Sequence, residues 1–186
     1  MPDSEIELQE RLKEAGNGLL NPPSSVDNLL DLLDCYDWGA YCREDKLERF
    51  LSNVDQAPPR SMQDALLPTM KALISSVLLR HSDEDVRFAV ASCMSEITRI
   101  TAPDAPYNDD QMKEIFQLTV ASFKKLSHAS GHCYTKAISI LENVARVRVK
   151  SLVNGIDFCF TNFSCLCHFL KDIGATADSM YCSISH

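Results

Sequence analysis

The residues best suited to chemistry in this 186-residue chain are the soft metal ligands of Cys165-Leu166-Cys167-His168. Zinc takes four thiolate or imidazole ligands in a tetrahedron, commonly from two units of the form Cys-x2-4-Cys. Here one residue separates the two cysteines, and the other ligands would have to be Cys159, Cys182 or His186. This spacing favours an apolar tail over a metal site. We therefore expect no metal and no cofactor, and a small zinc-binding protein remains an alternative.

A second group of reactive side chains, His128, His132 and Cys133, lies around a predicted turn at Gly131. A cysteine beside a histidine can form a nucleophile and its base, but no third residue at a suitable spacing would orient the base. The acidic run Asp83-Glu84-Asp85 is typical of the first turn of a helix and needs no metal to explain it. The chain has no P-loop, GxGxxG, nucleophile elbow or HExxH motif. We therefore expect no catalytic residues and no enzyme activity.

The overall charge argues against a free-standing nucleic-acid-binding module. The net charge is -8 and the isoelectric point is near 5, whereas such modules usually present a basic face to phosphates. The basic residues in the second half of the chain form only a weak patch, and we interpret them as solvated charges near helix ends. We therefore expect no direct sequence-specific nucleic-acid binding. This weak patch comprises Lys124-Lys125, Arg146, Arg148 and Lys150.

Three other arginines are better candidates for contact with a protein partner. Arg80, Arg87 and Arg99 flank or lie within one predicted helix, and they would be available if the face of that helix is used for binding. The alternative is that each forms a salt bridge with nearby acidic residues. They are the partner-binding residues that the sequence predicts.

The stretch 81–107 carries Arg87 and Arg99 and directly follows Arg80, and Ser82 in this stretch is a suitable helix N-cap. Apolar residues then recur at steps of three and four, and Pro103 and Pro106 stop the helix. Similar stripes recur along the chain, which has 45% hydrophobic and 24% charged residues. The stripe in this stretch consists of Val86, Val90, Cys93, Met94 and Ile97.

The helices repeat with a period of about 50 residues. Met62 and Met112 are 50 residues apart, and Ile97 and Val144 are 47 apart, close to the period of HEAT repeats, roughly 40–47 residues. We therefore predict an all-α fold, a short α-solenoid of HEAT/armadillo-like repeats with an irregular C-terminal tail. Residues 1–60 would form a helical region with an irregular insertion near 35–45. Residues 61–148 would form two helical hairpins, and 149–186 an atypical, poorly ordered tail.

The N-terminal residues are acidic and polar and do not resemble a secretory signal. No window of about 18 apolar residues predicts a membrane-spanning helix, so we expect no membrane association. The eight cysteines are then interpreted as reduced thiols, several of them filling the core.

One segment carries a family resemblance. Residues 97–118, ITRITAPDAPYNDDQMKEIFQL, are similar to the most specific segment of the cohesin-associated Pds (precocious dissociation of sisters) family, and residues 102–107 are its distinctive core. The resemblance implies a non-enzymatic HEAT superhelix in the nucleus. It further implies binding to the kleisin subunit of cohesin, indirect association with chromatin, and roles in sister chromatid cohesion, chromosome segregation and DNA repair. Other similar segments are 28–33, 58–62, 81–102 and 138–148.

The resemblance covers residues 1–148 and implies many more repeats than this chain contains. We expect a truncated member, with 149–186 translated from a retained intron or a wrong gene model. An unrelated HEAT or armadillo adaptor is the other interpretation of the same periodicity.

Overall fold

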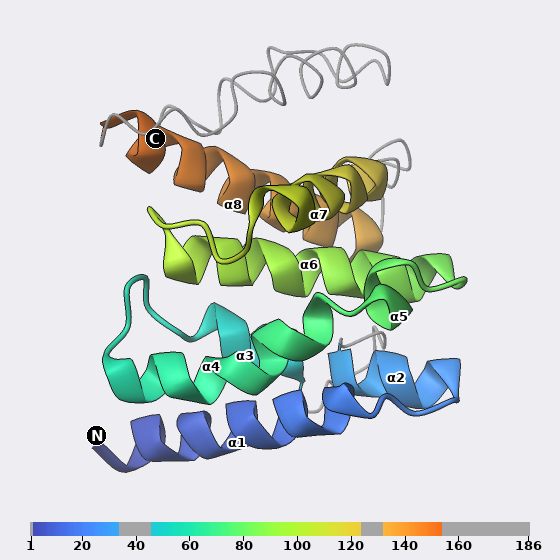
Figure 1. Cartoon of the computed structure of the whole chain (residues 1–186), viewed down its shortest axis with the longest axis horizontal. Coiled ribbons are helices and arrows are strands. Elements are labelled where there is room, and N and C mark those ends of the chain that lie inside the picture. The colour runs from blue at the N-terminus through green and yellow to red at the C-terminus, as the bar shows by residue number, and fades with distance from the viewer. Residues whose placement is uncertain (1, 34–45, 124–131, 154–186) are drawn as a thin grey trace.

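The computed structural model describes residues 2–33, 46–123 and 132–153. Within these ranges the chain forms eight helices and no strand (Figure 1). This confirms the predicted all-α, HEAT-like class. The helices are α1 (Pro2–Leu20), α2 (Val26–Leu33), α3 (Leu47–Ser52), α4 (Arg60–Leu73), α5 (Ser76–Leu79), α6 (Glu84–Thr101), α7 (Asp109–Ser122) and α8 (His132–Val153).

The helices stack in layers that form two rows. In Figure 1, α4 lies in front of α3 and α7 lies in front of α8. We call α1, α4 and α7 the A row, and α2, α3, α6 and α8 the B row. Along the A row α1 packs closely on α4, and along the B row α6 packs against α2 and α3 on one side and α8 on the other. Each A helix is thus followed in the chain by B-row helices of the same layer, which is the arrangement of a helical solenoid.

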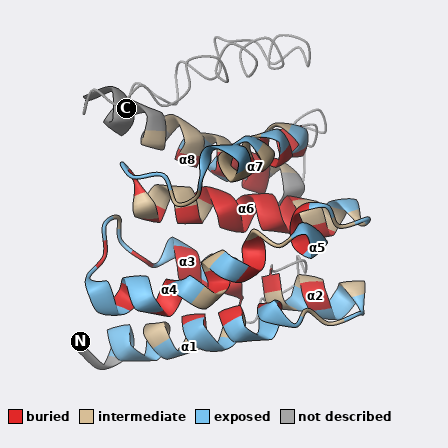
Figure 2. Cartoon of the chain, viewed as in Figure 1, coloured by how far each residue is buried: buried red, intermediate tan, exposed pale blue. Residues whose placement is uncertain are grey.

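The core runs through the stack and is centred on α6. Most residues of α6 are buried, as its red colour in Figure 2 shows, because helices from both neighbouring layers and from its own hairpin cover it. Burying a large aliphatic or aromatic side chain contributes about 1.5–3 kcal/mol, so these contacts dominate the stability. Fully buried members of this core include Leu12, Leu33, Leu51, Leu73, Met94, Ile97 and Phe123.

The helix starts differ in detail from the sequence prediction. The N-cap of α6 is Asp83, not Ser82: its Oδ1 accepts hydrogen bonds from the backbone N–H groups of Asp85 and Val86, at 2.9 and 3.0 Å. A carboxylate is favoured over a hydroxyl at this position because its charge also interacts with the positive end of the helix dipole. The start of α7 fits its prediction, with Asn108 and Gln111 forming a capping box.

The segment between residues 60 and 79 forms two helices, α4 and α5. Its first residue is Arg60, and Ser61 lies inside the first turn and provides no cap. Pro68 is accommodated within α4, and the helix ends at Leu73, after which α5 begins at Ser76. The break between the two helices therefore falls after residue 73.

The α1–α4 contact is close because Gly16 has no side chain. A Cβ atom at Gly16 would lie 2.5 Å from the backbone nitrogen of Thr69, whereas one at Gly18 would meet nothing within 4 Å. The hydroxyl of Thr69 donates to the Leu12 carbonyl across this contact, at 3.3 Å. Gly16 therefore sets how closely the first two A-row helices approach.

Helix α8 continues to Val153 and crosses the boundary that composition placed at residue 149. The predicted insertion near 35–45 and the tail beyond residue 153 lie outside the described residues and stay predictions. No helix of the described part is long and apolar enough to cross a membrane.

Candidate partner-binding surface

Arg80 is the most exposed of the three predicted partner-binding arginines. It follows α5, its side chain is 70% exposed, and its Nη2 lies 2.6 Å from the Glu114 carboxylate of α7. An ion pair this exposed contributes at most about 1 kcal/mol, so Arg80 can exchange Glu114 for an acidic group of a partner at little cost.

Arg87 and Arg99 are engaged within the chain. Arg87 Nη1 donates to the carbonyls of His81 and Ser82, at 2.6 and 2.9 Å, and so closes the turn before α6. Arg99 forms the salt bridge that the sequence offered as its alternative role: its Nε lies 2.7 Å from Glu96 Oε2, and both side chains are only 13% exposed. The two arginines lie roughly 18 Å apart along α6, at about 1.5 Å per residue, so the three do not form one patch.

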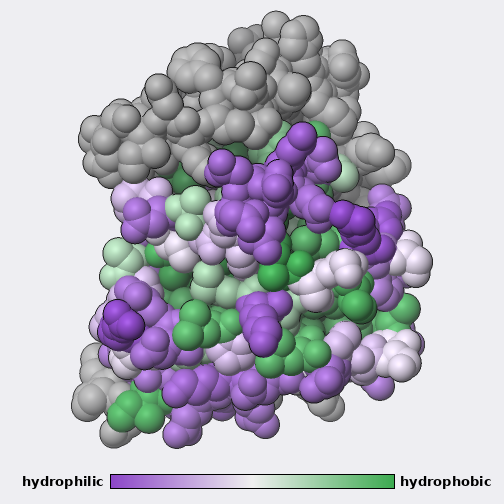
Figure 3. Space-filling model, in the orientation of Figure 1, coloured by the Kyte–Doolittle hydropathy of each residue, from purple (hydrophilic) through white to green (hydrophobic). Residues whose placement is uncertain are grey.

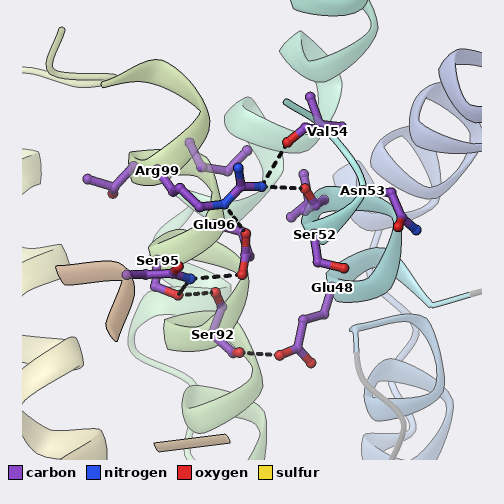
Figure 4. Close-up of polar contacts among 12 residues, drawn as sticks. Glu48, Ser52, Asn53, Val54, Ser92, Ser95, Glu96 and Arg99 are labelled. Atoms are coloured by element: carbon purple, nitrogen blue, oxygen red, sulfur yellow. Dashed lines mark hydrogen bonds and ion pairs between the residues drawn. The ribbon is translucent and has the colours of Figure 1, made fainter. Parts of the chain in front are cut away.

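The region near Arg99 contains a polar network that sequence reasoning missed (Figure 4). Arg99 Nη2 donates to the carbonyls of Leu51 and Val54, at 3.0 and 2.9 Å, and joins the end of α3 to the end of α6. The Glu96 carboxylate also accepts from Asn143 Nδ2 of α8, at 2.8 Å.

A second part of this network surrounds Glu48 of α3. Ser92 of α6 donates its hydroxyl to Glu48 Oε1, and Lys136 Nζ of α8 lies 2.5 Å from Glu48 Oε2. Ser92 and Lys136 are both buried, so these polar groups are satisfied by one another. Asn143 also donates to Ser95 Oγ, at 3.2 Å.

One signal in the sequence could have revealed the network. Its bonds between neighbouring B-row helices join residues 44 to 48 positions apart, such as Ser92 with Glu48 and Asn143 with Ser95. That separation matches the 47-residue spacing already visible in the apolar pattern. Polar residues in the middle of predicted inner helices, spaced by one repeat, therefore indicate bonds between layers.

The loop 102–108 between α6 and α7 is held by contacts to two other elements. Gln56 Nε2 donates to the Ala102 carbonyl, at 2.7 Å, and the Tyr107 hydroxyl donates to the Met70 carbonyl of α4, at 2.9 Å. Burial raises the pKa of Tyr107 well above its ordinary value, because the phenolate would lose its hydration. The segment that carries the family resemblance is thus a fixed part of the array.

The structure describes only some of the other residues that the sequence suggested for catalysis, metal binding or a basic patch. Asp83 acts as a helix cap, and the described residues hold no group of three His, Cys, Asp or Glu side chains positioned for a metal. Cys93 is buried, and its Sγ lies 3.8 Å from the Leu33 carbonyl oxygen. The side chains of His132, Cys133, Arg146, Arg148 and Lys150 lie outside the described part. So do His128, Lys124-Lys125, Cys159, Cys165, Cys167, His168, Cys182 and His186.

Comparison with known proteins identifies relatives of this chain. The model of the family described as "Sister chromatid cohesion protein PDS5 protein" matches residues 43–168. Two relatives from Arabidopsis thaliana are the sister chromatid cohesion proteins PDS5 homolog C, 50% identical over 173 residues, and PDS5 homolog D, 51% identical over 142 residues. These alignments cover 93% and 76% of this chain. No solved structure matches.

A more distant relative is the sister chromatid cohesion protein pds5 of Schizosaccharomyces pombe, 31% identical over 91 residues that cover 49% of this chain. The chain spans 19%, 16% and 8% of the homolog C, homolog D and fission-yeast proteins, respectively. It is therefore similar to a short part of each.

The expected end of the resemblance at residue 148 is wrong. The family match continues to residue 168, and the 173-residue alignment with homolog C also extends beyond 148. The change in composition near 149 misled the prediction, because cysteine and phenylalanine replace the charged residues of a typical surface helix there while the family likeness persists. The family match also removes the alternative of an unrelated HEAT or armadillo adaptor. The chain belongs to the sister chromatid cohesion protein PDS5 family.

Proposed function

We propose that this chain is a non-catalytic segment of a HEAT-type scaffold that acts in sister chromatid cohesion by binding the cohesin complex. Membership of the PDS5 family over residues 43–168 carries the proposal. A supporting observation is that the polar residues Glu48, Glu96 and Asn143 of the B-row helices bond to residues of other helices and so help to hold the layers together. Such a scaffold contributes to cohesion, chromosome segregation and DNA repair through its partners.

The partner we propose within cohesin is the kleisin subunit. Because the chain spans less than a fifth of its named relatives, it supplies part of a larger binding surface, and its affinity is expected to be lower than theirs. Arg80 is the proposed contact residue, since its side chain is 70% exposed and Glu114, with which it forms an ion pair, is itself on the surface.

The experiment is a pull-down of recombinant kleisin by the purified full chain. Wild type should retain kleisin, and Arg80→Glu should retain less, because the reversed charge repels an acidic partner. Arg60→Glu is the matched control: Arg60 is also exposed and lies at the start of α4, where an acidic residue suits the helix dipole. Absence of kleisin from the wild-type sample contradicts the proposal, and equal retention by both variants removes Arg80 from the contact.

We also propose that the chain is nuclear and reaches chromatin through cohesin without contacting DNA itself. The acidic charge supports this, because direct binding would require a basic face. In cells that express a tagged chain, depletion of kleisin should release the tag from chromatin. Retention after depletion would contradict the proposal.

A further inference from the structure

Glu48 and Lys136 come from helices that are not neighbours in the stack. Glu48 lies in α3 and Lys136 in α8, and α6 lies between these two helices in the B row. Lys136 Nζ is 2.5 Å from Glu48 Oε2, and Ser92 of α6 donates its hydroxyl to the other oxygen of the same carboxylate. One carboxylate therefore connects three consecutive layers.

The small side chains of α6 permit this contact. Ser92 contacts the Glu48 carboxylate beside the ion pair, and Ala89, one turn earlier, has only a methyl group. Both are buried, as is the Lys136 side chain at 5% exposure, while Glu48 is 21% exposed. A large side chain at position 92 would separate the ammonium from the carboxylate. The charged pair therefore draws α3 and α8 together over α6.

The A row is connected differently at this level. Helix α7 packs mainly against α6, with a smaller contact to α5, and the Tyr107 hydroxyl in the loop before α7 donates to the Met70 carbonyl of α4. The A row is thus joined by a hydrogen bond from a loop, and the B row by an ion pair between helices. Small rotations between repeats set the curvature of a solenoid, so contacts that fix one repeat against the next also fix that curvature.

We propose that Glu48, Ser92 and Lys136 form a clamp that fixes the angle between the α7–α8 layer and the layers before it. The clamp is a conformational device of the fold and does not depend on the proposed function. When it is released, the α7–α8 hairpin should rock against α6, while α1–α4 stay in place because their contact across Gly16 is independent of it.

Hydrogen–deuterium exchange of the full chain tests the clamp. Glu48→Gln removes the ionic attraction and keeps an oxygen for Ser92, and Lys136→Met removes the ammonium and keeps the length of the side chain. Each variant should raise the exchange rate of α8 amides about tenfold and leave those of α1 and α4 unchanged. Arg80→Ala, which breaks the exposed pair with Glu114, is the control and should leave α8 exchange unchanged.

A distance measurement separates rocking from local fraying. Nitroxide labels are attached to p-acetylphenylalanine at Leu67 of α4 and Gln117 of α7, both exposed, so that the native cysteines are not labelled. Double electron–electron resonance, a pulsed electron paramagnetic resonance method, measures the distance between the two labels. The distance distribution should be broader in Glu48→Gln than in wild type. Unchanged distributions, unchanged α8 exchange, or an equal rise of exchange in every helix would overturn the clamp. Glu48→Gln is the milder variant and keeps the test decisive if Lys136→Met fails to fold.

Discussion

Arg99 and Glu96 form a largely buried ion pair on one turn of α6, with 2.7 Å between Nε and Oε2. The same guanidinium donates to the Leu51 and Val54 carbonyls at the end of α3. Carbonyls at a helix end lack partners within the helix and carry partial negative charge, so a cation there is stabilising. Arg99 therefore joins two layers of the array.

Replacing Arg99 with methionine should lower the free energy of unfolding by about 2–3 kcal/mol, because hydrogen bonds to charged groups each contribute about 1.5–3 kcal/mol. Arg99→Lys should recover only part of this loss, since an ammonium cannot reproduce the planar fork of the guanidinium. Urea denaturation followed by circular dichroism measures both. Arg80→Ala is the surface control, with an expected loss below about 1 kcal/mol. Equal losses for Arg99→Met and Arg80→Ala would show that the inter-layer bonds contribute nothing.

Two glycines of α1 form a matched pair for testing the α1–α4 contact. Gly16→Ala should destabilise the chain by about 1–3 kcal/mol, because the new methyl group would meet the backbone of Thr69, which cannot rotate away. Gly18→Ala has open space and should stabilise it by about 0.5–1 kcal/mol through helix propensity. Thermal unfolding of both variants compares them directly. A stabilising Gly16→Ala would mean that α1 and α4 are further apart than described.

The cap of α6 offers a similar comparison between adjacent residues. Asp83→Ala should cost about 1 kcal/mol because two backbone N–H groups lose their acceptor. Ser82→Ala should cost less than about 0.5 kcal/mol, since Ser82 is exposed and only its backbone carbonyl is bonded, to Arg87. Urea denaturation distinguishes the two. The reverse order would restore Ser82 as the cap.

Because Tyr107 is buried, we expect the folded chain to lose stability at alkaline pH. Its folded-state pKa lies above its unfolded value of about 10, so its contribution is complete below that pH and is lost as the pH rises toward the folded-state pKa. The free energy of unfolding should fall by about 1 kcal/mol between pH 9 and 11 from this group alone. Tyr107→Phe should show a correspondingly smaller fall. Parallel pH profiles for wild type and variant would contradict the burial of Tyr107.

The sequence was sufficient for the fold class because apolar spacing and helix caps are local signals. Residues such as Val86, Val90 and Ile97 revealed α6 directly, and the recurrence near 47 residues revealed the repeat. Break positions were less predictable: Pro68 is a strong helix-breaking signal, yet tertiary packing keeps it inside α4. The N-cap of α6 is Asp83 and not Ser82, and which of the two residues caps the helix depends on backbone geometry that the local sequence does not specify.

The contact between Glu48 and Lys136 could not be predicted, because it joins α3 to α8, which are not neighbours in the stack, whereas the other bonds of the network follow the repeat spacing. Glu48 and Lys136 are 88 positions apart, and nothing near either residue indicates the other. The sequence suggested that the Arg99 side chain would be accessible to a partner, because a charged residue in a helix is usually exposed. In the structure its guanidinium instead donates a hydrogen bond to the Leu51 carbonyl of α3. Arg80 is the predicted residue whose side chain remains on the surface, since α5 ends there.

The proposed binding of this array to the kleisin subunit of cohesin can be measured by isothermal titration calorimetry. The purified full chain is titrated with recombinant kleisin after circular dichroism has established cooperative unfolding of the helices. We expect saturable binding with a stoichiometry of one to one, weakened by Arg80→Glu and unchanged by Arg60→Glu. No saturable heat of binding from a cooperatively folded chain would contradict it.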